Sequence, residues 1–294
     1  MRDHFYPHER NDSSVLNELE SIEINLLLEG IYRVYGFDFR HYLRSSLQRR
    51  IRNRMNAEGL PTITALLEKV LHDASFMKTL LNDFSINVTE MYRDQSFFRA
   101  FRQEIVPLLR PYSELRIWHA GCSTGEEVYS MAILLHEEGL LDRTKLYATD
   151  MNEQVIEQAK RGRFQLKRMQ SFTKNYQLAG GNREFSAYYT TDQEHAYFKP
   201  AISDNIVFAQ HNLATDSTFN EFHVILCRNV LIYFDTVLQH RVYNLFHESL
   251  TQRGFLGIGS KETLLSPFKT HYEELMPCER IYRKRLVQSN VNRE

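Results

Sequence analysis

Short apolar runs alternate with helical segments from residue 115 onwards. Helical periodicity is clearest at residues 152–161 and 236–250. Five runs have the length and composition of buried strands, and they lie at residues 115–120, 145–149, 205–210, 223–227 and 255–258. Because strands that alternate with helices form parallel sheets covered on both faces, this pattern predicts an α/β fold.

The residues before this region carry helical periodicity only. Apolar side chains recur every three or four positions from residue 62 to residue 81, which predicts one helix that starts near Thr62. We therefore expect an all-helical N-terminal domain over residues 1–95 and an α/β domain over residues 96–294.

The stretch from residue 185 to residue 198 interrupts the alternation. It is rich in tyrosine and phenylalanine, and it is flanked by Gly180-Gly181 and Pro200. Closely spaced aromatic residues between turn-forming residues are typical of short antiparallel strands. The sequence thus predicts a small antiparallel β-subdomain inserted at about residues 173–203.

Charge and cysteine content narrow the class of protein. Lys and Arg number 36 against 37 Asp and Glu, so no overall field favours nucleic acid or an anionic membrane. The three cysteines are too few for a disulfide framework and have no metal-like spacing with histidine. No apolar run is long enough to cross a bilayer. We expect a cytoplasmic protein without metal, nucleic-acid partner or membrane insertion.

A glycine turn between the first strand and the next helix is the strongest site signal. Gly121 and Gly125 allow a sharp turn and let a ligand approach main-chain N–H groups. Asp150 ends the following strand, where doubly wound sheets place a carboxylate that accepts hydrogen bonds from a ribose. Together these features predict a nucleoside-binding site.

The residues after the turn indicate the charge of the ligand. The glycine fingerprints of dinucleotide and phosphate loops are absent, and Glu126 and Glu127 would repel a phosphate. They suit a ligand with a positive group and no phosphate. S-adenosylmethionine, which carries a sulfonium and an ammonium group, fits this description.

Two alternatives remain for the same turn. Its sequence matches the G-x-S-x-G nucleophile elbow of hydrolases, with Ser123 as nucleophile and His211 or His240 as base. Only helices precede this strand and no HGGG-type segment occurs, which counts against a hydrolase. The other alternative is a binding module without catalysis, or a turn that binds nothing.

Further polar residues follow other predicted strands. Arg228, Asn229 and Tyr233 come after the fourth run, and Asn212 after the third. The carboxyl ends of parallel strands meet at the edge of the sheet where ligands bind. A third polar cluster, at residues 89–94, by itself indicates the solvated start of a helix.

Five motifs resemble, in order, those of the CheR family of chemotaxis receptor methyltransferases. They are Asn87-Val88-Thr89 with Arg93, the string from Ala120 to Glu127, Ala148-Thr149-Asp150, His211-Asn212-Leu213 and the string from Cys227 to Asp235. The resemblance implies a helical domain joined to a Rossmann-like class I methyltransferase domain with an inserted β-subdomain. It also implies methyl transfer from S-adenosylmethionine to glutamate side chains on the cytoplasmic helices of chemoreceptors, with S-adenosylhomocysteine as product.

The same resemblance assigns roles by motif position. Asp150 would bind the ribose hydroxyls and Asn212 would lie near the adenine. Arg93 and Tyr233 would be catalytic, facing the transferred methyl group and the incoming carboxylate. The residues that would line the cofactor pocket are Asn87, Thr89, Arg93, Glu127, Asp150, Asn212, Leu213, Arg228 and Asn229.

The resemblance also implies two partner surfaces. In similar proteins a basic helix of the N-terminal domain docks on the receptor, and five arginines crowd one such segment here: Arg44, Arg49, Arg50, Arg52 and Arg54. A solvated helix surface is the alternative. Some members grip a receptor C-terminal peptide with the β-subdomain, and the turn at Gly180-Gly181 is compatible with a hairpin there. A receptor-like protein that serves motility or biofilm control is an alternative substrate.

Two strings depart from the family pattern. Met91-Tyr92 replaces two phenylalanines, and the added hydroxyl predicts an altered fit to the substrate. The string from Gly257 to Glu262 departs from a Gly-His-Ser-Glu-like motif, and Lys261 is unexpected there.

Overall fold

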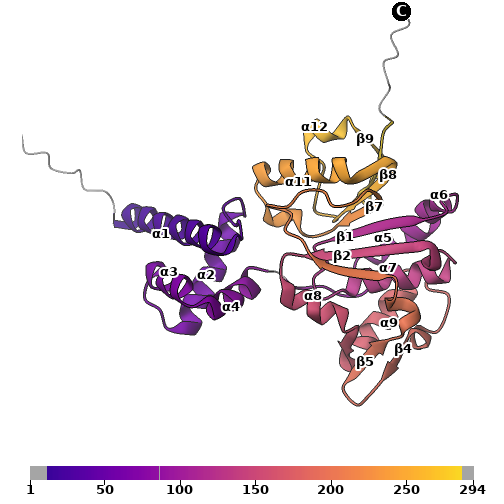
Figure 1. Cartoon of the computed structure of the whole chain (residues 1–294), viewed down its shortest axis with the longest axis horizontal. Coiled ribbons are helices and arrows are strands. Elements are labelled where there is room, and N and C mark those ends of the chain that lie inside the picture. Colours follow the sequence, from indigo (N-terminus) through magenta and orange to yellow (C-terminus); the bar gives the residue numbers. More distant parts are fainter. Residues whose placement is uncertain (1–11, 86, 287–294) are drawn as a thin grey trace, which may run out of the picture. The chain divides into compact units, whose positions relative to one another are not determined.

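The computed structural model describes residues 12–85 and 87–286. The chain forms two compact units, and the division between them falls after Ser85 (Figure 1). No helix in the described ranges is long and apolar enough to cross a membrane.

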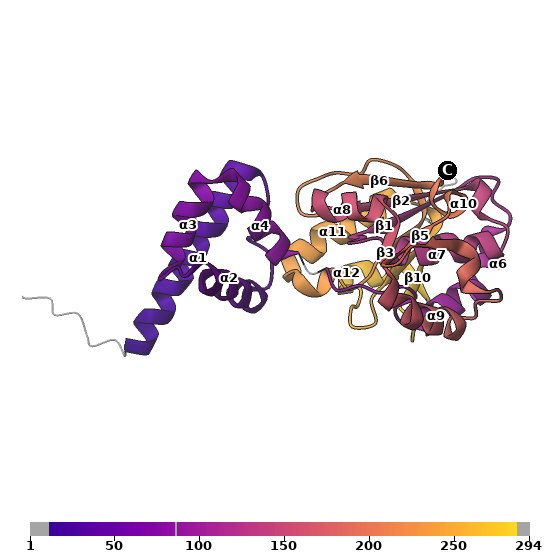
Figure 2. The same ribbon diagram turned by 90° about the horizontal axis from the view of Figure 1, so that it is seen from below.

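The N-terminal unit is helical in its described part, as Figure 1 and the turned view of Figure 2 show. Its helices are α1 (Asp12–Tyr35), α2 (Arg44–Glu58), α3 (Ile63–His72) and α4 (Ala74–Phe84). Each presents an apolar stripe to a shared core, as amphipathic helices of a small bundle do. The buried side chains include Leu27, Ile31, Phe39, Leu47, Ile51, Leu66, Val70, Leu80 and Phe84.

The single helix expected from residue 62 to residue 81 is wrong in one respect, because it is broken at Asp73. Thr62 caps α3 as expected, since its side chain accepts a hydrogen bond from the Ala65 N–H. Asp73 adopts an extended backbone, and its carboxylate accepts from the N–H groups of Ser75 and Phe76. A capping aspartate competes with helix continuation, so the same apolar stripe is divided between two helices.

The second unit contains a seven-stranded sheet in the order β6-β2-β1-β7-β8-β10-β9. The first five strands in that order run parallel, as the sequence predicts, but β10 is antiparallel to both neighbours. The sheet is therefore mixed, because the last two strands form an antiparallel hairpin. The apolar pattern of the sequence does not predict these two short strands. The strands are β1 (Leu115–Ala120), β2 (Thr144–Asp150), β6 (Ile206–Gln210), β7 (Phe222–Cys227), β8 (Leu250–Ile258), β9 (Tyr272–Met276) and β10 (Ile281–Lys284).

Helices cover both faces of this sheet (Figure 1). Alternate side chains of β1 point to opposite faces of the sheet. The Trp118 ring lies 5.5 Å from that of Phe246 in α11 (Thr236–Ser249), whereas Ile117 packs in the core that contains α7 (Glu126–Glu137). Burial on both faces explains why the strands read as continuous apolar runs. The α-helices are α5 (Gln95–Ala100), α6 (Val106–Leu109), α7 (Glu126–Glu137), α8 (Glu153–Lys160), α9 (Met169–Leu178), α10 (Pro200–Ser203), α11 (Thr236–Ser249) and α12 (Ser266–Lys269), and a π-helical turn (Phe101–Ile105) joins α5 to α6.

A second, three-stranded antiparallel sheet is inserted between α8 and β6. Its strands are β3 (Arg163–Gln165), β4 (Tyr189–Thr191) and β5 (His195–Phe198), in the order β3-β5-β4. The first of them precedes residue 173, and α9 lies between β3 and β4. Aromatic side chains form the core of this subdomain, including Phe164, Phe172, Tyr176, Phe185, Tyr188 and Phe198.

Candidate active site

The loop after β1 turns where the sequence predicts. Gly121 and Gly125 both have positive φ angles, of 80° and 93°. A Cβ atom on Gly121 would lie 2.6 Å from Cγ2 of Val230, which follows β7. Glycine is thus required at Gly121 both by the backbone angle and by the close approach of a second loop.

Asp150 lies at the end of β2, beside this turn. Its carboxylate accepts hydrogen bonds from the Ser123 N–H at 3.0 Å and the Asn152 N–H at 3.1 Å. Burial raises the pKa of the Asp150 carboxyl, and these hydrogen bonds act in the opposite direction. Two carboxylate oxygens have about four acceptor positions, so Asp150 retains capacity for a ribose diol.

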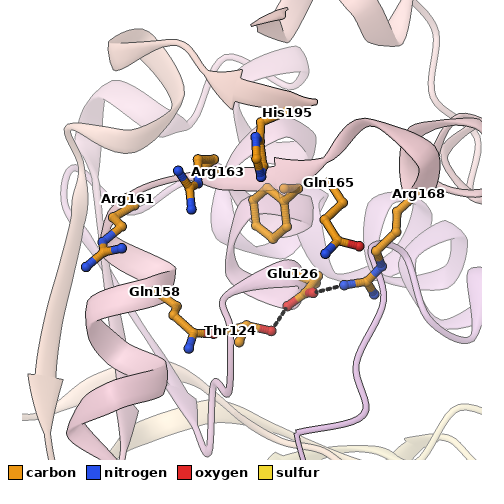
Figure 3. Close-up of a pocket in the computed structure, with 9 residues that line it drawn as sticks. Thr124, Glu126, Gln158, Arg161, Arg163, Gln165, Arg168 and His195 are labelled. Carbon is orange, nitrogen blue, oxygen red and sulfur yellow. Dashed lines mark hydrogen bonds and ion pairs between the residues drawn. The ribbon is translucent and has the colours of Figure 1, made fainter. Parts of the chain in front are cut away.

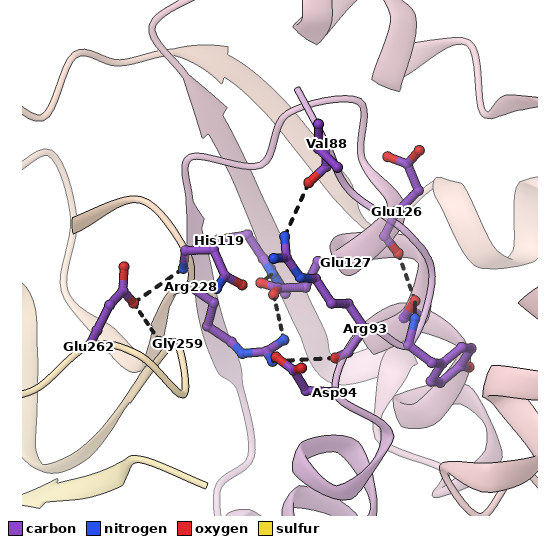
Figure 4. Close-up of polar contacts among 12 residues, drawn as sticks. Val88, Arg93, Asp94, His119, Glu126, Glu127, Arg228, Gly259 and Glu262 are labelled. Carbon is purple, nitrogen blue, oxygen red and sulfur yellow. Dashed lines mark hydrogen bonds and ion pairs between the residues drawn. The ribbon is translucent and has the colours of Figure 1, made fainter. Parts of the chain in front are cut away.

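Arg228 is the buried centre of a chain of polar and charged side chains (Figure 4). Its side chain is 2% exposed, and its guanidinium lies 2.6 Å from Asp94 and 3.0 Å from Glu127. The opposite oxygen of Glu127 lies 2.9 Å from Nδ1 of His119. Burial alone would raise the pKa of Glu127, but the His119 hydrogen bond and the Arg228 charge outweigh it and lower the pKa. The Glu127 carboxylate is therefore ionised and fixed at the turn.

Glu126 does not share this position, which corrects the expectation that both glutamates face a positive ligand. Its side chain is fully buried, accepts from the Thr124 hydroxyl at 2.6 Å and pairs with Arg168 at 2.8 Å (Figure 3). Successive residues of an α-helix point about 100° apart, so the first turn of α7 directs its two carboxylates to different surroundings. Only Glu127 is available to the nucleoside site.

Glu262 is a site residue that the sequence reasoning missed. Its buried carboxylate accepts hydrogen bonds from the N–H groups of Asn229 and Ile232, each at 3.2 Å, and from that of Gly259 (Figure 4). It thereby holds the loop that carries Arg228 and Asn229. In the sequence, the string from Gly257 to Glu262 attracts attention only because it departs from the family motif. Lys261, the unexpected residue in that string, is exposed.

Strained backbone concentrates in the same loops. Among the described residues, six other than glycine have positive φ, and four of these are Tyr92, Asp94, Ser123 and Asn229. Each of the four is held by a hydrogen bond or ion pair: Tyr92 N–H to the Ser130 hydroxyl, Asp94 to Arg228, Ser123 N–H to Asp150, and Asn229 N–H to Glu262. Such strain persists only where surrounding contacts enforce it, and it clusters at functional sites.

The other expected cofactor residues lie in or next to these loops. The Ser123 hydroxyl approaches the Asn87 amide oxygen at 3.4 Å, and the main chain of Thr89 accepts from Arg168. The His211 N–H donates to the Asp150 carbonyl, which brings the buried Leu213 and the half-buried Asn212 to the end of β6. The structure therefore joins four of the five motifs through hydrogen bonds, and Arg228 joins the fifth through Glu127.

The two expected catalytic residues differ in their surroundings. The Arg93 guanidinium donates to the Val88 carbonyl at 3.1 Å and has no carboxylate partner in the described ranges (Figure 4). Tyr233 is half-buried at the end of a 3₁₀ turn, Leu231–Tyr233. Its hydroxyl has no hydrogen bond to Arg93 or Arg228 in the part of the chain that the structure describes. The catalytic role of Tyr233 stays a prediction.

The hydrolase alternative finds no support in this geometry. Ser123 is buried, and its hydroxyl approaches an asparagine amide, with no histidine within hydrogen-bond distance among the described residues. In the same ranges, no group of three or more His, Cys, Asp or Glu residues could hold a metal ion.

The arginines of α2 are largely paired inside their own unit. Arg54 lies 2.9 Å from Asp83, Arg52 lies 2.7 Å from Glu20, and Arg44 lies 2.7 Å from the Asn25 amide. Arg50 donates to the Asp83 carbonyl, whereas Arg49 is exposed. Because carboxylates neutralise part of this charge, the basic surface of α2 is weaker than the arginine count predicts.

Tyr92, which departs from the family pattern, lies inside the protein and not on its surface. The side chain is fully buried against Phe98 and Tyr176, and its hydroxyl has no hydrogen-bond partner among the residues that the structure describes. Burying an unpaired hydroxyl destabilises the fold. We expect Tyr92→Phe to raise the free energy of unfolding in urea by about 1 kcal/mol.

Tyr129→Phe is the matched control for this prediction. The Tyr129 hydroxyl is also buried, but it donates to the Ala159 carbonyl at 3.0 Å. Its removal deletes this hydrogen bond, although the Gly162 N–H still donates to the same carbonyl, and should lower the free energy of unfolding by about 1 kcal/mol. Equal losses in the two variants would show that the Tyr92 hydroxyl is satisfied in solution.

The fold and these contacts define a Rossmann-like enzyme unit with a nucleoside-type cofactor site at the carboxyl ends of its strands. The sequence model described as "CheR methyltransferase, SAM binding domain" matches residues 87–281, and that described as "CheR methyltransferase, all-alpha domain" matches residues 22–85. The chain belongs to the CheR methyltransferase family, and its cofactor is S-adenosylmethionine.

Several curated relatives are similar over most of their length. The Pseudomonas putida protein that carries the name methyltransferase Cher3 is 50% identical over 90% of this chain and 97% of its own. Chemotaxis protein methyltransferases of Listeria monocytogenes and Salmonella typhimurium are each 28% identical, over 81% and 79% of this chain and 88% and 80% of their own. Among solved structures, the N-methyltransferase NodS of Bradyrhizobium japonicum covers 64% of this chain and 87% of its own, with 16% identity and a TM-score of 0.36.

The residues present fit this cofactor. Asp150 has free acceptor positions for a ribose, Gly121 and Gly125 open the main chain to a ligand, and the fixed Glu127 places a negative charge beside the turn. A cationic, phosphate-free nucleoside is compatible with that charge.

Proposed function

We propose that this protein transfers a methyl group from S-adenosylmethionine to glutamate side chains on the cytoplasmic helices of chemoreceptors. Relatives named chemotaxis protein methyltransferases support the process, and the family supports the cofactor. The observation that carries the substrate class is Arg93, a guanidinium in a cofactor motif that has no carboxylate partner in the described ranges. A guanidinium without a carboxylate partner in a cofactor motif suits an incoming carboxylate.

The proposed reaction requires the protein chiefly to position the glutamate carboxylate and the cofactor. When bound, the cofactor supplies an electrophilic methyl group on a sulfonium. A glutamate has a reference pKa near 4.3 and is already ionised at neutral pH, so no residue of the chain has to act as a base. Asp150 would bind the ribose and Arg93 would orient the carboxylate, while the Arg228 and Glu262 contacts hold the loops that carry both sides of the site. Alignment of this kind can supply a large part of a rate enhancement.

The N-terminal unit would bring the receptor to this site. We propose that α2 contacts the acidic receptor surface chiefly through Arg49, because the neighbouring arginines already bind groups of their own unit. The receptor helices are cytoplasmic, so the proposal places the protein in the cytoplasm.

The substrate class is tested with a purified chemoreceptor cytoplasmic fragment and methyl-labelled S-adenosylmethionine. We expect labelled products whose mass spectra place the methyl group on glutamate, and loss of the label in mild alkali, as for an ester. Alkali-stable label on lysine or asparagine would contradict the proposal. Titration of the same sample with S-adenosylhomocysteine separates a wrong substrate from a cofactor site that does not bind.

Arg93→Ala should lower kcat in this assay by about a hundredfold, because the carboxylate loses the group that aligns it. The dissociation constant for S-adenosylhomocysteine should change by only about threefold, since Asp150 and the glycine turn are untouched. Arg93→Lys, which keeps the charge without the planar fork, should give an intermediate kcat. An unchanged kcat in Arg93→Ala would exclude the role.

A further inference from the structure

A hollow of about 370 Å³ lies where the β-subdomain meets α8 and the start of α7 (Figure 3). The residues that line it include Thr124 and Glu126 from the glycine turn and helix α7, Arg161, Arg163 and Arg168 near the small sheet, and His195 from β5. None of the nine expected cofactor residues lines it. It is thus a separate site that borders the cofactor loop.

The arginines give this hollow an uncompensated positive charge. Arg168 is neutralised by the buried Glu126. Arg161 and Arg163 have no carboxylate within ion-pair distance in the described ranges, and the partner of Arg163 is the neutral hydroxyl of Tyr197. Other arginines of the same unit, such as Arg102 and Arg228, are paired with two carboxylates each. Two guanidiniums without a carboxylate partner thus line one hollow, and their charges favour an anion there.

The histidine and the acidic residues near the hollow do not form ion pairs with its two unpaired arginines in the described ranges. The carboxylates of Asp192 and Glu194 both lie 3.9 Å from Nδ1 of His195, on the turn between β4 and β5, and neither lines the hollow. Asp192 accepts from the Tyr197 hydroxyl at 2.6 Å, and neither carboxylate forms an ion pair with Arg161 or Arg163 in the described ranges. The ligand that fits is an anion with several acceptor oxygens, such as a carboxylate, which arginine binds through paired N–H donors.

We propose that this hollow binds acidic side chains of the substrate protein next to the glutamate that is methylated. This rests on the proposed function. Glu126 lines the hollow and is the neighbour of Glu127 in the first turn of α7. Arg168 also lines the hollow, and it donates a hydrogen bond to the main chain of Thr89, in the motif that contains Arg93. A helix rises about 1.5 Å per residue. If a substrate helix presents one glutamate to the cofactor, its next acidic residues would therefore lie near the hollow beside the cofactor loop. The hollow selects glutamates that have acidic neighbours.

The experiment uses the full chain saturated with S-adenosylhomocysteine. The probe is a fluorescein-labelled helical peptide with a glutamate pair in every heptad, and its reference has glutamine at those positions. Anisotropy titrations compare the wild type with Arg161→Gln/Arg163→Gln. The control, Lys269→Gln/Arg285→Gln, removes two exposed positive charges from α12 and the segment after β10.

We expect the Arg161/Arg163 variant to bind the acidic peptide about fivefold more weakly, because two partly exposed charge pairs are lost. The control should lose less than twofold, and the wild type should prefer the glutamate peptide to the glutamine peptide. With a receptor fragment as substrate, the same variant should raise KM with little change in kcat. Methyl acceptor glutamates without acidic neighbours should be unaffected.

Three results would overturn the proposal: equal peptide affinity in the wild type and the Arg161/Arg163 variant, equal losses in that variant and the control, or direct binding of inorganic phosphate that depends on Arg161 and Arg163 in a protein that does not bind the peptide. The last would identify a small-anion site. The S-adenosylhomocysteine titration reports the cofactor site independently, and the peptide titration needs no turnover. A wrong reaction and a wrong docking site are therefore distinguishable.

Discussion

Replacing Asp150 with alanine should lower the affinity for S-adenosylhomocysteine by about a hundredfold. The half-buried carboxylate lies at the end of β2 and would accept hydrogen bonds from both ribose hydroxyls. Hydrogen bonds to a charged group contribute about 1.5–3 kcal/mol each, and a loss of about 3 kcal/mol corresponds to a hundredfold change in the dissociation constant. Isothermal titration calorimetry measures this effect directly.

Asp150→Asn is the control for the contribution of charge. It keeps the shape and one acceptor oxygen, so we expect a loss of about tenfold. Because burial raises the pKa of Asp150, acidification should weaken binding to the wild type at a higher pH than an ordinary aspartate would give. Wild-type affinity in a folded Asp150→Ala sample, verified by its thermal transition, would remove Asp150 from the cofactor site.

Replacing Arg228 with methionine should lower the free energy of unfolding of the α/β unit by about 3 kcal/mol. The variant leaves the carboxylates of Asp94 and Glu127 facing each other without the cation between them. Their side chains are 36% and 20% exposed, so partial hydration keeps the loss at the lower end of the range for broken buried pairs. Urea unfolding followed by circular dichroism measures the change.

Two further variants test the cause of that loss. Lys160→Met breaks an exposed pair with Glu157 in the same unit and should change the free energy by less than about 0.5 kcal/mol. Adding Glu127→Gln to Arg228→Met removes one uncompensated charge and should recover part of the stability. A double variant less stable than Arg228→Met would show that charge repulsion is not the cause.

The sequence predicts the positions of the motifs well because their signals are local. The strand runs appear within one or two residues of β1, β2, β6, β7 and the end of β8. Asp150 and Arg228 stand directly at strand ends, so knowing the strands places them at the ligand-binding edge. The hairpin of β9 and β10 was not predicted, since its exposed positions interrupt the apolar pattern.

Local sequence patterns do not predict the residues that support the site, because these residues act through contacts with distant parts of the chain. Glu262 lies in a segment without helix or strand, and its three N–H partners come from two loops. The burial of the Tyr92 hydroxyl also depends on α9 and its Tyr176, which the sequence places far away. The positive φ of Tyr92 and Ser123 has no signature in residue type, whereas asparagine, as at Asn229, adopts this conformation more readily.

The sequence by itself determined an α/β unit behind a helical one, a glycine turn, and polar residues at the carboxyl ends of the strands. These follow from periodicity and from residues that are neighbours in the chain. The tertiary structure decided which charges meet: Glu126 pairs with Arg168 across 42 positions, and Glu127 pairs with Arg228 across 101. An ion pair depends on the distance between two groups in space, and only the packing of distant segments sets that distance.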